Sequence, residues 1–176
     1  IGIIGPESTG KSTLANQLAG VLHASVVPEY AREYVELLDC PYTYDDVVII
    51  AKKQIEQLSA VYPSSIVLFD TELIITKVWF EHKYGSCPEF VNRYLQSSPL
   101  DFYLLCSPDL PFVPDPVREN PNTRDELFRQ YLDLVKESGV PYSIVTGTGE
   151  CRTACALTAI NNLPQSKSDF QQPKAL

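Results

Sequence analysis

Hydrophobic and polar residues alternate along the chain in two kinds of pattern. Short apolar runs of strand length precede Gly5 and occupy residues 24–28, 65–69, 101–106 and 142–145. Between them, apolar residues recur at helical spacing, which predicts helices after Gly10 and over residues 44–62, 71–84, 88–95, 124–136 and 151–163. Strands that alternate with helices predict an α/β fold with three αβα layers and a parallel sheet of about five strands. We therefore expect ligands to bind at the carboxyl ends of the strands.

The first apolar run leads directly into a phosphate-binding pattern. Gly5, Gly10, Lys11 and Ser12 fit G-x-x-x-x-G-K-[ST], and Thr13 follows at the start of a helical pattern. The glycines let successive backbone N–H groups point at one anion at the positive end of a helix dipole. Lys11 supplies charge for the outer phosphates of a nucleotide, and the Ser12 hydroxyl can bind the bridging Mg²⁺. A surface turn before an ordinary helix is disfavoured, because strand, motif and helix agree.

Carboxylates follow two of the later strands. Asp70 ends the run 65–69, a position where phosphate-loop proteins commonly hold magnesium. A cap on the helix 71–84 is a second role for Asp70, compatible with the first. Glu29 opens the segment EYAREY directly after the run 24–28, where an open α/β sheet usually places ligand groups. The alternative for this segment is a charged helix start with i, i+3 pairs.

Residues 107–122 form the least regular part of the chain. Their five prolines exclude a helix or a central strand, while Asp115 and Arg118 supply charge. A long irregular loop in a compact domain is usually functional or mobile. We expect residues 1–163 to form one domain and residues 164–176 to form a polar tail.

Composition narrows the classes of partner. The chain has 176 residues and a formal net charge of −8, so no basic footprint for a nucleic acid is present. Its five cysteines show no zinc-site spacing, and His23 and His82 are expected to be structural or surface residues. No apolar run approaches membrane-spanning length and no signal-peptide pattern precedes the phosphate loop, so we expect a cytoplasmic protein with reduced thiols and no membrane partner.

Four segments together resemble one kinase family. The chain contains, in this order, GPESTGKSTLANQLA, VPEYAREY, LFDTELIITKVWFEHKYG and PDPVRENPNTRDELF. These segments resemble the ribosylnicotinamide kinase domain of bifunctional nicotinamide-nucleotide adenylyltransferase/ribosylnicotinamide kinase proteins, which are grouped among AAA-like phosphate-loop ATPases. The likeness extends to about Leu163, and no segment corresponds to the adenylyltransferase or a DNA-binding domain. It implies a nucleoside-kinase-like fold with a lid loop.

The resemblance also implies a reaction and residue roles. ATP with Mg²⁺ would phosphorylate the 5′-hydroxyl of a small nucleoside, nicotinamide riboside, to give nicotinamide mononucleotide. The ATP phosphates would be held by Gly5, Glu7, Ser8, Thr9, Gly10, Lys11, Ser12, Thr13 and Arg124. Lys11, Glu29, Asp70 and Arg118 would be catalytic, and Ser12 and Asp70 would hold the metal.

The acceptor side leaves alternatives open. Glu29 and Asp70 are both plausible bases, and we assign Glu29 to the substrate hydroxyl and Asp70 to Mg²⁺. A cationic nicotinamide ring favours electron-rich aromatic faces, and the predicted substrate-binding residues are Tyr30, Arg32, Tyr34 and Trp79. A lone Trp is more often part of a core.

The family's lid carries Asp-Asp-Gly-x-Arg. Here residues 114–118 depart from that pattern at two positions while keeping Asp115 and Arg118. A kinase for another nucleoside or nucleotide, and an ATP-dependent regulatory switch, remain the alternative functions. The sequence gives no expectation for the oligomeric state.

Overall fold

Five parallel strands form a single sheet at the centre of the protein. The computed structural model describes residues 1–115, 118 and 122–163. Its strands are β1 (Gly2–Ile4), β2 (Ser25–Val27), β3 (Val67–Asp70), β4 (Tyr103–Cys106) and β5 (Tyr142–Val145). They lie in the order β2-β3-β1-β4-β5, and every neighbouring pair is parallel. The predicted parallel sheet of about five strands is confirmed, and the predicted tail 164–176 lies outside the described residues.

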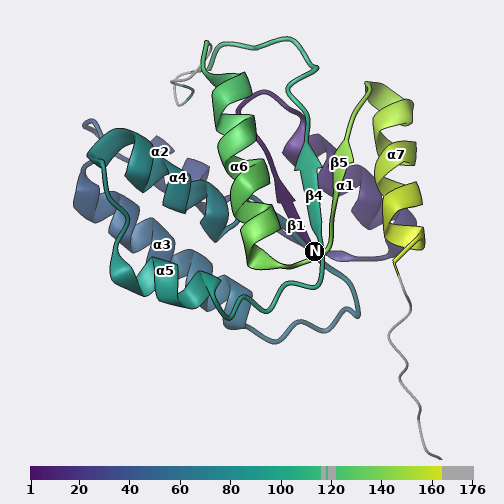
Figure 1. Cartoon of the computed structure of the whole chain (residues 1–176), viewed down its shortest axis with the longest axis horizontal. Helices are drawn as coiled ribbons and strands as arrows, with labels where there is room; N and C mark the ends of the chain where they lie inside the picture. Colours follow the sequence, from purple (N-terminus) through teal and green to yellow (C-terminus); the bar gives the residue numbers. More distant parts are fainter. Residues whose placement is uncertain (116–117, 119–121, 164–176) are drawn as a thin grey trace, which may run out of the picture.

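Helices cover both faces of the sheet. They are α1 (Lys11–Leu22), α2 (Tyr30–Glu36), α3 (Tyr44–Ser59), α4 (Leu73–Tyr84), α5 (Glu89–Leu95), α6 (Arg124–Ser138) and α7 (Gly149–Asn161). Figure 1 shows α2 to α5 gathered on one side of the strands and α7 on the other. Within the described ranges, no helix is long and apolar enough to cross a membrane.

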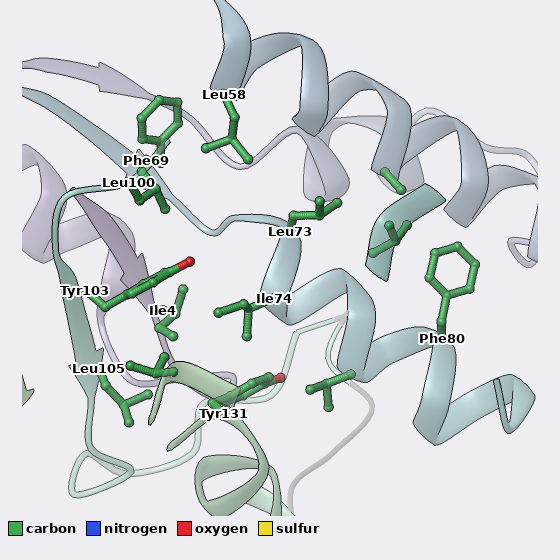
Figure 2. Close-up of a cluster of buried hydrophobic side chains, with 14 of the residues drawn as sticks. Ile4, Leu58, Phe69, Leu73, Ile74, Phe80, Leu100, Tyr103, Leu105 and Tyr131 are labelled. Carbon is green, nitrogen blue, oxygen red and sulfur yellow. The ribbon is translucent and has the colours of Figure 1, made fainter. Parts of the chain in front are cut away.

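Two buried clusters separate these layers. Successive strand residues point to opposite faces, so Ile3 and Leu104 pack with α1 and α7, whereas Ile4 and Leu105 pack on the other face. Figure 2 shows Ile4, Tyr103 and Leu105 beside Leu73 and Ile74 of α4, with Tyr131 of α6 nearby. Packing of α4 and α6 on the same sheet face fixes the two helices that later form one wall of the candidate site.

The start of α4 differs from the expected one. The helix begins at Leu73, and the Glu72 carboxyl group caps it by accepting a hydrogen bond from the Ile74 N–H at 3.0 Å. Thr71, between the strand and this cap, has φ of +69°, a rare conformation for a β-branched residue. The alternative role of Asp70 as the helix cap is therefore wrong, and its carboxylate is left for other chemistry.

Candidate active site

The phosphate loop joins β1 to α1 through left-handed backbone. Gly5 has φ of +145°, Ser8 +56° and Gly10 +71°. A Cβ added at Gly5 would lie 2.6 Å from the Cys106 carbonyl oxygen, so the loop passes β4 too closely for any side chain at that position. The Thr9 hydroxyl closes the loop from inside by donating to the Pro6 carbonyl at 2.8 Å.

The loop presents positive charge at the start of α1. Gly10 occupies the N-cap position with no side-chain cap, and no acidic residue lies in the first turn of the helix. Its first N–H groups are therefore open to an anion. Lys11 Nζ donates to the Gly5 and Pro6 carbonyls at 3.0 Å each, which holds the ammonium group over the loop. This arrangement can bind the phosphates of a nucleotide.

Ser12 and Asp70 lie together beside the loop. The Ser12 hydroxyl hydrogen-bonds the Asp70 carboxylate, and both residues line an opening of about 460 Å³ together with Glu29. Burial raises the pKa of Asp70, while Ser12 and Lys11 oppose that change. The buried Asp70 Oδ1 has no partner among the described residues. A hydroxyl and a carboxylate with a free oxygen are hard ligands that fit Mg²⁺ shared with phosphate oxygens.

A cavity of about 350 Å³ extends from the phosphate loop. Gly5 and residues 7–13 line it, as do Ala31, Arg32 and Val35 of α2. From α4 come Ile75, Val78 and Trp79, and from α6 come Leu127 and Tyr131. The volume suits a small ligand, and the lining combines a charged wall with an apolar and aromatic one.

Glu29 lies where these two openings meet. It lines both of them and occupies the N-cap position of α2 without capping the helix through its side chain. Burial raises the pKa of Glu29, the Lys11 ammonium lowers it, and the Asp70 carboxylate raises it. A carboxylate that has been removed from water next to a cationic loop can accept a proton from a bound hydroxyl.

The segment after β4 lies against both the loop and α2. Ser8 Oγ accepts from the Val113 N–H at 3.1 Å and donates to the Val113 carbonyl at 3.3 Å. Arg32 Nη2 donates to Asp115 Oδ2 at 2.8 Å. Arg118 also lines the cavity and donates to the Val113 carbonyl. The predicted lid arginine is therefore at the cavity, whereas residues 116–117 of the predicted lid lie outside the described residues.

Arg124 lies elsewhere than expected. It is only 8 % exposed, and its guanidinium donates to the Pro108 and Leu110 carbonyls. It does not line the cavity with the phosphate loop. Because Arg124 is the first residue of α6, its side chain lies beneath the loop that follows β4. Its guanidinium supports that loop and is not at the cavity beside the phosphate loop.

The predicted aromatic residues of EYAREY also lie away from the cavity. That segment is helical, so Tyr30 and Tyr34 share a face four residues apart. Their ring centroids are 5.9 Å apart, and the Tyr34 hydroxyl donates to Asp46 Oδ1 at 2.9 Å. Arg32 is two residues from each tyrosine, on the opposite side of the helix, and does line the cavity.

Trp79 lines the cavity with a partner that the sequence did not indicate. Its Nε1–H donates to the Tyr42 hydroxyl at 3.0 Å, and the two ring centroids are 4.8 Å apart at 75°. His82, expected to be structural or on the surface, is exposed and also lines the cavity. The spacing of residues 75, 79 and 82 on α4 could have indicated this wall, because such residues share one helix face. Leu127 and Tyr131 of α6 are likewise four residues apart, whereas no comparable pattern indicates Tyr42.

One family matches most of the chain. An AAA domain matches residues 1–152. The chain belongs to this AAA domain family. Curated relatives of this AAA domain include the trifunctional NAD biosynthesis/regulator protein NadR of Salmonella typhimurium, 25% identical over 150 residues, and that of Escherichia coli, 24% identical over 150 residues. Each alignment covers 81% of this chain and 37% of the relative, so the chain spans little more than a third of their length.

Solved structures share the fold of this AAA domain. A NadR protein in complex with NR has a TM-score of 0.72 at 25% identity, covering 91% of this chain and 50% of that one. A NadR protein in complex with NAD and AMP-PNP has a TM-score of 0.70 at 24% identity, covering 91% and 48%. Deoxyadenosine kinase from M. mycoides has a TM-score of 0.64 at 13% identity, covering 91% and 97%. The predicted nucleoside-kinase-like fold and the predicted resemblance to adenylyltransferase/ribosylnicotinamide kinase proteins are both confirmed.

Proposed function

We propose that this protein is an ATP-dependent kinase that phosphorylates the 5′-hydroxyl of nicotinamide riboside to nicotinamide mononucleotide. One observation carries the proposal: a single cavity joins the phosphate loop to the Glu29 carboxylate and to an aromatic wall. The similarity to the NadR proteins, one of them solved with NR, supports the choice of nucleoside.

The donor side binds the triphosphate. The N–H groups at the start of α1 and the Lys11 ammonium neutralise phosphate oxygens, and Arg118 adds a second cation from the lid segment. Ser12 and Asp70 would hold Mg²⁺, which neutralises charge on the outer phosphates when bound. Phosphoryl transfer depends mainly on this positioning and charge stabilisation.

The acceptor side orients the nucleoside. Glu29 takes the proton of the 5′-hydroxyl as that oxygen bonds to the γ-phosphorus and the bond to the β–γ bridging oxygen breaks, so ADP leaves with the electron pair. The rings of Tyr42 and Trp79 contribute electron-rich surface against which a cationic pyridinium ring is stabilised. The negative charge of Glu29 in the same cavity favours that cation further.

A coupled assay of ADP release tests the proposal. Activity should depend on nicotinamide riboside, and Lys11→Ala should lower kcat/KM at least about 100-fold, because a cation at the transferring phosphoryl group is lost. Lys53→Ala is the matched control: Lys53 pairs with Glu56 on the exposed face of α3, so activity should not change. Turnover of magnesium-ATP that no nucleoside stimulates would contradict the proposal. Preference for thymidine or a nucleoside monophosphate would show a different kinase.

A further inference from the structure

A buried polar pair lies at the wall that α4 contributes to the cavity. Thr76 of α4 lines the cavity and is 1 % exposed. Gln54 of α3 lies behind it, 3 % exposed, with Oε1 at 2.6 Å from Thr76 Oγ1. The reaction described above uses neither residue. Polar groups in such a wall usually determine which ligand is bound and in which orientation.

The direction of this hydrogen bond determines what Thr76 offers to a ligand. A separation of 2.6 Å is typical of O–H···O bonds and is short for N–H···O bonds. The Thr76 hydroxyl is therefore the donor and Gln54 Oε1 the acceptor. Its proton is engaged, so Thr76 Oγ1 can only accept a hydrogen bond from a ligand.

The pair is also incomplete. Gln54 Nε2 is buried and has no hydrogen-bond partner among the described residues. A buried polar group without a partner costs on the order of 1–3 kcal/mol. Gln54 does not line the cavity, so the group that this pair offers to a ligand is Thr76 Oγ1, which needs a donor. A primary carboxamide carries N–H donors for this oxygen, whereas a carboxylate carries only acceptors.

We propose that the Gln54–Thr76 pair makes the kinase select a nucleoside whose base carries a carboxamide over the corresponding carboxylate. Thr76 Oγ1 accepts a hydrogen bond from the amide N–H, and Gln54 is a positioning residue that holds the Thr76 hydroxyl in its accepting orientation. A carboxylate at the same place would put its acceptor oxygens against the acceptor Thr76 Oγ1. It would also add a second negative charge to a cavity that contains Glu29. This inference rests on the proposed kinase function and specifies its acceptor.

The test compares nicotinamide riboside with nicotinic acid riboside. For the unmodified protein, kcat/KM should favour the amide at least about 100-fold, since a site that hydrogen-bonds a substrate N–H strongly rejects an analogue without it. Thr76→Val, which removes the acceptor while keeping the shape, should lower this ratio about 10-fold or more. Thr76→Ser keeps the hydroxyl and should retain the ratio within about threefold. Gln54→Leu should raise kcat/KM for the acid, because the hydroxyl can then turn and donate.

The KM for ATP and the melting temperature separate specificity from damage to the fold. The KM for ATP should change by less than about twofold in all three variants, because neither residue belongs to the phosphate loop. Equal rates of the unmodified protein on amide and acid would overturn this inference while leaving the kinase proposal standing, whether or not any variant folds. The inference would also be overturned if folded Thr76→Val kept the same ratio of kcat/KM for the amide to kcat/KM for the acid. If neither nucleoside is phosphorylated, the proposed function fails and this inference fails with it.

Discussion

The carboxyl group of Glu72 is buried inside the protein. It is 1 % exposed, and its Oε1 accepts a hydrogen bond from the Ile74 N–H at the start of α4. Burial raises the pKa of Glu72 to about 8, an effect that the backbone amides at the start of the helix only partly oppose. At neutral pH the folded protein therefore holds a proton on Glu72, whereas the unfolded chain releases it.

This difference predicts how stability depends on pH. Between about pH 4.5 and 8 the folded state binds more protons at Glu72 than the unfolded state, so the free energy of unfolding falls as pH rises through this window. Glu72→Gln keeps an oxygen for the Ile74 N–H and cannot ionise. The free energy of unfolding of this variant should therefore fall less over the window than that of the unmodified protein, by a difference on the order of a few kcal/mol. Urea unfolding followed by the fluorescence of the single tryptophan measures both slopes.

Glu56→Gln provides the control for that comparison. Glu56 lies on the exposed face of α3, where its side chain is 68% exposed, so its loss should leave the pH slope unchanged. If Glu72→Gln and the unmodified protein show the same slope, Glu72 is ionised in the folded state and the argument from burial is wrong.

Site residues that are adjacent in the chain can be predicted from the sequence, whereas those that come together only in the fold cannot. Gly5, Lys11 and Ser12 are adjacent in the chain, so their spacing alone predicts an anion site. Tyr131 joins the same cavity from more than a hundred residues away, and no local pattern reports that contact. The positive φ of Thr71 cannot be predicted from the sequence either, because it follows from how β3 connects to α4. Contiguous motifs can be predicted, whereas a wall assembled by tertiary packing cannot.

At the scale of elements, the orientation of each helix decides which predicted residues reach the cavity. For the helical EYAREY segment, ligand groups and i, i+3 pairs were the two interpretations. Arg32 lines the cavity, and its ion pairs are an i, i+4 pair with Glu36 of α2 and a pair with Asp115. Tyr34 bonds Asp46 of α3, so α2 presents Ala31, Arg32 and Val35 to the cavity. Hydrophobic periodicity predicts that a helix forms, but the packing against α3 sets its rotation.

The ion pair between Arg32 of α2 and Asp115 holds the segment after β4 against the cavity and should help to close the site around its substrates. The side chains of Arg32 and Asp115 are 34% and 20% exposed, so their ion pair contributes about 1 kcal/mol. Asp115→Asn should therefore raise the KM of both substrates about two- to fivefold. It should also increase ATP hydrolysis without nucleoside relative to transfer, because water reaches a less closed site more often.

Steady-state kinetics with and without nucleoside measure these effects. Lys53→Gln breaks another ion pair, the exposed pair with Glu56 on α3, and should change neither quantity. A variant Asp115→Asn with unaltered KM values and unaltered background hydrolysis would show that the pair does not contribute to closure.

At the scale of the whole molecule, the candidate site is held by segments that are far apart in the sequence. The phosphate loop follows β1, Glu29 follows β2, Asp70 ends β3, and Arg118 belongs to the segment after β4. All four strands are parallel, so their carboxyl ends meet at one edge of the sheet. The alternation of strands and helices was enough to predict this arrangement. A ligand bound at this edge contacts most of the fold and should stabilise it as one unit.

Thermal unfolding with a non-hydrolysable ATP analogue checks that expectation. At about 100 times its Kd, AMP-PNP with Mg²⁺ should add about 2.7 kcal/mol to the free energy of unfolding. For a chain of this size that corresponds to a rise in melting temperature of roughly 5–10 °C. EDTA should remove most of the rise, and Ser12→Ala should make the remaining shift insensitive to Mg²⁺. An equal rise with and without Mg²⁺ in the unmodified protein would contradict the assignment of Ser12 and Asp70.

The contacts of Val113 and Asp115 have a consequence for how the two substrates influence each other. One short segment forms hydrogen bonds both with Ser8 of the phosphate loop and with Arg32 of α2. If nucleotide binding stabilises that segment, it raises the affinity for the nucleoside. Nucleoside binding must then raise the affinity for the nucleotide by the same factor. The two ligands should therefore bind with reciprocal cooperativity although they occupy different walls of the cavity. A substitution in the segment would change the affinity for a substrate that it never touches.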